Sequence, residues 1–232
     1  MITGERAAEP SAGEDPAGSA TSSGRTFRIV LIAVLAVAAL VSAGAVGWLT
    51  GHHAGSVSVS DGSVDAGFAR DMSIHHQQAV VMAGFERDHS SNPDLKLLAY
   101  NIEDTQSFEI GQMQGWLDTW GLVRSTTRPL MQWMAGHGHL ASDGLMPGMA
   151  TADQMDHLQS LHGVALDVDF LQLMIRHHQG GIPMEQYVVD HATKSYVRNL
   201  AQAMKTAQSG EIIQMEQLLR KLGGSPLPPP TD

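Results

Sequence analysis

The chain has 232 residues, a formal net charge of −10 and no cysteine. The missing cysteines exclude disulfides, thiolate metal sites, cysteine nucleophiles and lipid attachment at a cysteine, so any soft metal ligand must be methionine. The acidity argues against a nucleic-acid surface, which needs clustered Lys and Arg. It is compatible with attracting cations, and equally with keeping the domain soluble.

The first fifty residues differ in composition from the rest. Residues 1–26 are rich in Ala, Ser, Gly, Glu and Pro, which predicts a disordered tail. Residues 27–49 carry one charge, Arg28, and are long enough for a transmembrane helix or signal anchor. Because Arg6 and Arg25 precede this segment, the positive-inside rule keeps the tail cytoplasmic. We therefore expect a single-pass cell-membrane protein whose C-terminal domain lies outside the cytoplasm.

A cleaved signal peptide is the alternative interpretation of this segment. Residues 43–45 have the small-x-small form of a cleavage site, and cleavage after Ala45 would give a secreted protein. Residues 50–63 are expected to be a linker in either case. His52 and His53 fall in this linker and are weak metal candidates.

An internal repeat organises the exported part of the chain. Residues 65–121 align without a gap onto residues 167–223, a constant shift of 102 positions, and 19 of the 57 aligned pairs are identical. Both copies contain the order Met-x-x-His-His-Gln. A duplicated unit is the simplest account, so we expect one domain over residues 64–222 and a Pro-rich tail over 223–232.

Each copy is predicted to form two helices. The first copy predicts helices over 64–89 and 94–120, separated by a Ser-Ser-Asn-Pro cap, and the second predicts 163–191 and 193–222. Such short connections make antiparallel hairpins. Two amphipathic hairpins bury their apolar faces only by pairing. The predicted fold is therefore all-α, a four-helix bundle built from two repeated helical hairpins about a pseudo-twofold axis, preceded by one transmembrane helix.

The two copies diverge next to the histidine pair. Gly180, Gly181 and Pro183 replace better helix formers of the first copy. Proline lacks the N–H that would bond four residues back, so we expect the second copy to bend just after its histidines.

The repeated Met-x-x-His-His order is the main candidate metal site. Met72, His75 and His76 lie within about one helical turn of each other, and Met174, His177 and His178 repeat them. Thioether sulfur with imidazole selects Cu⁺ and tolerates Cu²⁺, whereas Mg²⁺ or Ca²⁺ would demand oxygen ligands. Copper is therefore the first expectation, and zinc or nickel bound through histidine alone is the alternative.

Further methionines at helical spacing extend this candidate set. They are Met82, Met113, Met184 and Met215. The competing interpretation is that these four, with Met204, simply fill the core. Glu109 and Glu211 can face inward beside Met113 and Met215, and Gln and Glu side chains are expected to orient the imidazoles.

The segment between the copies, residues 125–162, is also dense in sulfur and imidazole. We expect an accessory metal site there, formed by Met131, Met134, His137, His139, Met146 and Met149, with Met155, His157 and His162 as further potential ligands. The alternative is that this Met-rich segment caps an open end of the bundle.

Several motifs together resemble one known family. They are Asp65-x-x-Phe68, Met72-x-x-His75-His76, Leu145-Met146-Pro147-Gly148-Met149, and Asp169-Phe170-Leu171-x-x-Met174-Ile175-x-His177-His178-Gln179-Gly180. Over residues 64–222 the chain resembles the family catalogued as domain of unknown function 305. The resemblance implies an exported protein, a ferritin-like helical bundle, and copper binding through the matched Met and His positions.

A ferritin-like bundle raises the rival of a di-iron oxidase. Such enzymes need Glu-x-x-His on two helices. Glu86-x-x-His89 fits once, but its counterpart is Val188-x-x-His191. We therefore expect no enzymatic turnover. The expected function is copper capture, buffering or handover to an unidentified protein. A metal-free bundle that docks a membrane partner is the remaining alternative.

Overall fold

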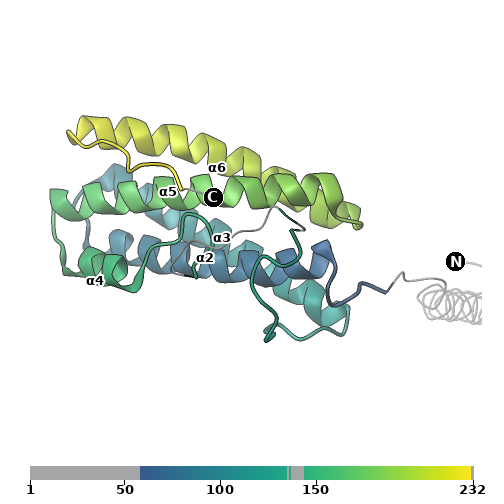
Figure 1. The fold of residues 1–232 in the computed structure, drawn as a ribbon. Coiled ribbons are helices and arrows are strands. Elements are labelled where there is room, and N and C mark those ends of the chain that lie inside the picture. The colour runs from purple at the N-terminus through teal and green to yellow at the C-terminus, as the bar shows by residue number, and fades with distance from the viewer. Residues whose placement is uncertain (1–57, 135, 137–143, 231–232) are drawn as a thin grey trace, which may run out of the picture. The chain divides into compact units, whose positions relative to one another are not determined.

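The computed structural model describes residues 58–134, 136 and 144–230, and these residues form five helices and no strand (Figure 1). The helices are α2 (Val64–His89), α3 (Pro93–Thr119), α4 (Ala152–Ser160), α5 (Val164–His191) and α6 (Ser195–Lys221). The expected all-α fold is confirmed. The expected tail, the membrane segment over 27–49, its alternative cleavage site and residues 50–57 of the linker lie outside the described residues. No helix in the described part is both long and apolar enough to cross a membrane.

The ends of the long helices agree with the sequence to within two residues, because their caps are local. The Ser63 side chain accepts a hydrogen bond from the N–H of Ala66 at the start of α2. At the start of α3 the Asn92 side chain accepts from the N–H of Asp94, and Pro93 occupies the first turn, as predicted. α5 is continuous through Pro183, so the proline is accommodated inside a helix.

The short helix α4 was not predicted. Thr151 and Gln154 form a capping box at its start, in which each side chain bonds to the backbone of the other. This Thr-x-x-Gln pattern was the sequence signal for a helix start inside the inter-repeat segment.

The four long helices pack as two hairpins, α2 with α3 and α5 with α6 (Figure 1). The two hairpins meet through α2 and α5, the helices that carry the histidine pairs. The repeated units therefore face each other with their Met-x-x-His-His segments at the centre.

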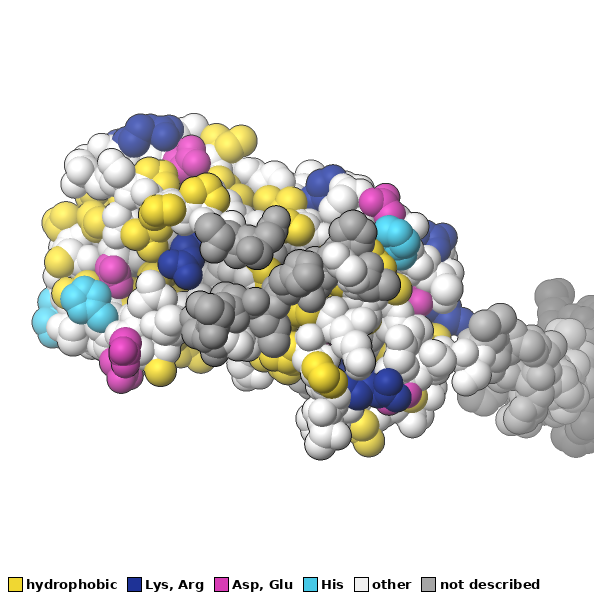
Figure 2. Space-filling model, in the orientation of Figure 1, with side chains coloured by type: hydrophobic (Ala, Val, Ile, Leu, Met, Phe, Trp, Pro, Cys, Tyr) yellow, Lys and Arg dark blue, Asp and Glu magenta, His cyan; other side chains and the backbone are white. Residues whose placement is uncertain are grey.

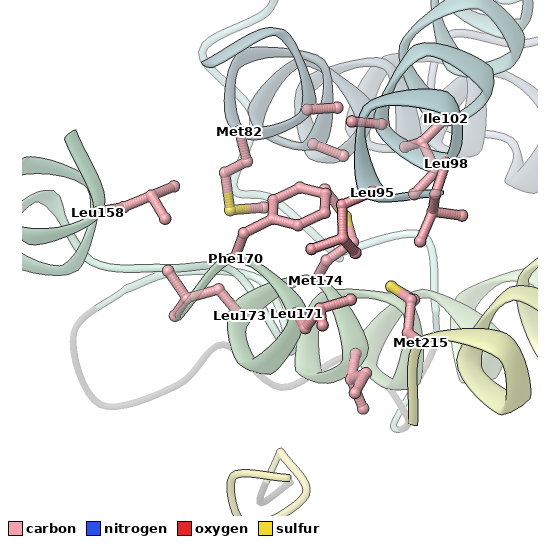
Figure 3. Close-up of a cluster of buried hydrophobic side chains, with 14 of the residues drawn as sticks. Met82, Leu95, Leu98, Ile102, Leu158, Phe170, Leu171, Leu173, Met174 and Met215 are labelled. Carbon is pink, nitrogen blue, oxygen red and sulfur yellow. The ribbon is translucent and has the colours of Figure 1, made fainter. Parts of the chain in front are cut away.

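The core of the bundle is divided into two apolar clusters. The first contains Met174 and Met215 of the second repeat together with Met82 of the first, packed around Phe170 (Figure 3). The second contains the repeat-related set of Met72, Met113 and Met184. Of these six repeat-related methionines, each cluster takes two from one repeat and one from the other, as a twofold arrangement of hairpins requires.

Polar side chains separate the two clusters at mid-length of every long helix. We call these eight residues the polar layer: His75 and His76 on α2, Gln106 and Glu109 on α3, His177 and His178 on α5, and Gln208 and Glu211 on α6. All are buried except Glu211, whose side chain is 23% exposed. Along its length the bundle therefore consists of one apolar cluster, the polar layer and the second apolar cluster.

Two repeated aspartates join the hairpins to each other. Asp65 of the first repeat accepts hydrogen bonds from the backbone N–H groups of Thr193 and Lys194 and from the Thr193 hydroxyl, at 2.8 to 3.0 Å. Its counterpart Asp167 accepts from the hydroxyl of Ser90, at 2.7 Å. Each aspartate thus holds the connection between the two helices of the opposite repeat.

We predict that Asp65→Ala lowers the free energy of unfolding by about 2–3 kcal/mol, because it leaves two backbone N–H groups and a hydroxyl without an acceptor. Urea unfolding followed by circular dichroism measures the change. Asp104→Ala removes an exposed aspartate from α3 and serves as the control, with an expected change below about 0.5 kcal/mol. Equal effects of the two substitutions would contradict the structural role of Asp65.

Candidate functional site

The four repeated histidines lie buried where α2 meets α5. His75, His76, His177 and His178 are at most 1% exposed. The rings of His75 and His177 are in contact across the two helices, with 3.8 Å between their centroids. The tertiary structure therefore brings together the two histidine pairs that the sequence singled out.

The contacting pair is held by backbone carbonyls. The Nε2 of His75 donates to the carbonyl oxygen of Pro147, and the Nε2 of His177 donates to the carbonyl oxygen of His75, both at 3.0 Å. A carbonyl can only accept, so Nε2 carries the proton and Nδ1 carries a lone pair. In the described part of the chain, the buried Nδ1 of His75 has no hydrogen-bond partner.

The other two histidines are held by repeated glutamates. Nε2 of His76 lies 2.9 Å from Oε2 of Glu109, and Nε2 of His178 lies 2.8 Å from Oε2 of Glu211. Among the described residues, Nδ1 of His76 and Nδ1 of His178 are buried with no hydrogen-bond partner. A carboxylate that fixes one ring nitrogen and leaves the other free is the usual arrangement behind a metal-binding histidine.

Burial keeps the imidazoles of His75, His76 and His177 neutral. Loss of hydration lowers the pKa of His75 and that of His76 to about 3, with nearby histidines adding to the effect. Burial likewise holds the pKa of His177 well below its usual range. Neutral rings present a lone pair to an ion without first losing a proton, so binding would not compete with protonation near neutral pH.

The acidic side chains of the centre show the opposite shift. Burial, and then the charge of Glu211, raises the pKa of Glu109 to about 7. Burial, and then Glu109 and Glu211, raises the pKa of Glu185 to about 9. Glu185 was not among the site residues predicted from the sequence. Its counterpart in the first repeat is Ala83, so the internal alignment carried no signal for it.

The inter-repeat segment closes over the histidine pair. Gln78 on α2 bonds to both the N–H and the carbonyl oxygen of Ala150, at 2.7 and 2.8 Å. The backbone of Pro147 lies so near α5 that a Cβ on Gly180 would come within 2.0 Å of the Pro147 oxygen. Gly180 is the counterpart of Gln78. The two copies thus diverge here because the first binds the inter-repeat segment through the Gln78 side chain. In the second copy, Gly180 leaves room for the backbone of that segment.

The predicted methionine ligands lie mainly in the apolar clusters. Met72, Met82, Met113, Met174, Met184 and Met215 are fully buried there, as are the accessory candidates Met131, Met134 and Met146, and Met149 is partly buried. His137 and His139 lie outside the described residues. Metal binding by any of these side chains stays a prediction.

Asp71 ties the start of the inter-repeat segment to α2. One of its carboxylate oxygens accepts from the N–H of Met131 and from the indole N–H of Trp133, at 2.7 and 2.8 Å. Trp133 in turn lies directly over Gly67, where a Cβ would come within 2.3 Å of the indole. The segment is therefore anchored to the first repeat at this end as well.

No three histidine, aspartate or glutamate side chains within residues 58–134, 136 and 144–230 already form a metal centre. The polar layer offers separate donors instead, three of which are Nδ1 atoms without a partner. Buried polar atoms are normally hydrogen-bonded, and each exception calls for an explanation such as an ion. The arrangement is therefore suited to receive an ion once side chains turn toward it.

Comparisons with known proteins agree with this architecture. The family model described as domain of unknown function (DUF305) matches residues 65–219. The fold is similar to a DUF305 protein of Streptomyces coelicolor, described as a proposed secreted protein, with 41% identity over 73% of this chain and 99% of that chain and a TM-score of 0.68. A DUF305 fragment of Deinococcus radiodurans has 30% identity over 68% of this chain and 96% of that chain, with a TM-score of 0.57.

A third similar structure is CopM in the Cu(I)-bound form, with 29% identity over 69% of this chain and 98% of that chain and a TM-score of 0.53. CopM has also been solved in Cu(II)-bound and silver-bound forms. No curated protein matches the chain.

The buried acids predict that stability falls as the pH rises. Glu185 and Glu86, whose pKa burial raises to about 9 and about 8, keep a proton in the folded state that the unfolded chain has already lost. Raising the pH from 6.5 to 9 in metal-free buffer should therefore lower the free energy of unfolding, by at most about 1.4 kcal/mol per pH unit for each group. Below pH 6.5 stability falls again as the pH is lowered, because burial lowers the pKa of His75, His76 and His177, which therefore become charged only on unfolding.

Urea unfolding at a series of pH values tests this. The double substitution Glu86→Gln with Glu185→Gln should flatten the alkaline slope. Glu216→Gln, at a partly exposed carboxylate paired with Arg220, should leave it as in the wild type. A wild-type profile that is flat from pH 6.5 to 9 would refute the protonated state of the two acids.

Proposed function

This chain belongs to the DUF305 family, and we propose that it captures copper outside the cytoplasm and buffers it or hands it to another protein. The observation that carries the proposal is the meeting of four buried imidazoles, three of which keep an Nδ1 atom without a hydrogen-bond partner among the described residues. The similarity to CopM, a protein solved with Cu(I), Cu(II) and silver, supports copper as the ion.

The chemistry of the donors supports a soft or borderline ion. Imidazole suits Cu²⁺ and Zn²⁺, and imidazole with thioether favours Cu⁺. Along α2, Met72 lies one turn before the histidines, and along α5, Met174 lies one turn before its pair. The first candidate ligands therefore remain Met72, His75, His76, Met174, His177 and His178. Glu109 and Glu211 would orient the rings of the histidines that they hold.

The location outside the cytoplasm rests on the apolar segment 27–49 and the arginines before it. The description of the Streptomyces coelicolor relative as a proposed secreted protein supports it. Charges of both signs are dispersed over the face shown in Figure 2, with no extended basic patch among its described residues. This distribution supports a metal ion, rather than a nucleic acid, as the partner.

We propose binding without chemical turnover. Glu86-x-x-His89 was the single fit to a di-iron motif, but His89 is exposed, stacks on Phe85 and donates from Nδ1 to the carbonyl oxygen of Phe85. Glu86 is fully buried. The two side chains therefore face different surroundings, which favours a binding role. Oxygen consumption by the iron-loaded protein would overturn this part of the proposal.

The proposal predicts that His76→Gln with His178→Gln weakens Cu⁺ binding at least tenfold, because both free Nδ1 donors are removed. The affinity is measured by competition with a chromophoric Cu⁺ chelator under reducing conditions. The matched control is His89→Gln with His191→Gln, a second repeat-related pair. These two histidines are exposed and stacked on Phe85 and Tyr187.

Far-UV circular dichroism must show that both double variants are folded. The thermal shift caused by Cu⁺ gives a second readout, since a ligand stabilises the folded state that binds it. Wild-type affinity in the His76 and His178 variant would remove the site from the polar layer and place it in the inter-repeat segment.

A further inference from the structure

Glu185 is a buried acid for which the proposed copper site has no use. It is 0% exposed, and neither carboxylate oxygen has a hydrogen-bond partner among the described residues. Alanine occupies the equivalent position of the first repeat, so Glu185 is an addition to the duplicated plan. An unpaired acid at such a site costs stability, which favours a role in binding a ligand.

The space in front of Gly181 shows which residues Glu185 faces. A Cβ on Gly181 would lie 3.0 Å from Oε1 of Gln208, 3.6 Å from Oε1 of Glu185 and 3.5 Å from Cε1 of His75. Glu185 lies one turn after Gly181 on α5 and so points to the same side. Gln208 is 4% exposed, and its Oε1 is also without a partner within the described chain. Two unpaired oxygens from α5 and α6 therefore point into the polar layer.

The charges around this space are mainly negative. Glu109 and Glu211 lie near enough to Glu185 to raise its pKa, and Lys205 acts weakly in the opposite direction. The ammonium of Lys205 bonds to the side-chain oxygen of Gln186. The side chains around this space are therefore chiefly oxygen acceptors with little positive charge among them, a composition that suits a cation.

We infer that Glu185 is an oxygen ligand for a divalent cation held in the polar layer, together with Oε1 of Gln208 and the Nδ1 of His75, which border the same space and have no hydrogen-bond partner among the described residues. The inference rests on the proposed function, since it uses one of the same histidines. It goes further by naming a carboxylate-and-imidazole site for borderline divalent ions. Such ions accept oxygen and nitrogen ligands, whereas Cu⁺ and Ag⁺ prefer thioether sulfur with imidazole.

An ion can reach this site from the side of α6. The Glu211 side chain is 23% exposed, while Glu109 is 10% and His76 and His178 are 0% exposed. Glu211 therefore connects the polar layer to solvent. Within the described part of the chain no hydrogen bond holds either oxygen of Glu185, so its carboxylate can turn toward an ion.

The test compares Glu185→Gln with Glu86→Gln in the full-length chain. Glu86 is also 0% exposed with both oxygens unpartnered, but it lies near Asp167 and outside the polar layer, so its substitution makes the same chemical change elsewhere. Co²⁺ is the divalent probe, since its visible absorption reports bound ligands, and Ag⁺ is the soft probe. Both are titrated into metal-free protein at pH 7.5.

The expected result is that Glu185→Gln weakens Co²⁺ binding at least tenfold and alters its visible spectrum, while Ag⁺ affinity stays within twofold of the wild type. Glu86→Gln should leave both ions unaffected. Unchanged Co²⁺ binding in Glu185→Gln, or an equal loss in Glu86→Gln, overturns the inference. A wild-type chain that binds Ag⁺ but not Co²⁺ also overturns it and leaves the proposed function standing, whereas a chain that binds neither ion overturns both.

Discussion

The structure depends on burying a polar layer across the middle of an otherwise apolar helical bundle. Burying polar side chains, seven of the eight in this layer, is costly unless they are hydrogen-bonded to one another or to the backbone. Here the imidazoles satisfy one nitrogen each, His76 and His178 through glutamates, and His75 and His177 through carbonyls. The polar atoms of the layer that lack a hydrogen-bond partner among the described residues are Nδ1 atoms and a few side-chain oxygens. Their burial lowers stability, and a bound ion would offset this loss.

The polar layer also constrains how the helices pair. On each long helix the buried residues belong to one apolar cluster before the layer and to the other cluster after it. A shift of either hairpin by one turn would move imidazoles into an apolar cluster and methionines into the layer. Because both errors leave polar groups buried without partners, the layer selects a single register, a role attested for buried polar residues in other bundles.

Gene duplication explains most of the site, and its exceptions cluster around the polar layer. Asp65 and Asp167 lock the hairpins in a repeated way, and the histidine–glutamate pairs are repeated to within 0.1 Å. The symmetry is broken where Gly180 stands in the position equivalent to Gln78 and where Glu185 stands in the position equivalent to Ala83. The first difference lets the inter-repeat segment cover one side of the histidines. The second difference adds the carboxyl group of Glu185 to a layer that already contains those of Glu109 and Glu211.

The sequence alone determined the four long helices, the duplicated hairpins and the histidine pairs, because caps, helical spacing and internal alignment are local or repeated signals. Tertiary structure decided the rest of the site. Pro147, which accepts from His75, is 72 positions away from it, and nothing in the sequence indicates which ring nitrogen a carbonyl will occupy. Glu185 has no repeated counterpart, so only packing places it beside Gln208 and the two glutamates. Helical spacing indicated that the methionines lie on buried faces of the helices, and they do. Whether a buried face belongs to an apolar cluster or to the polar layer depends on contacts between helices, which the spacing of residues along one helix does not reveal.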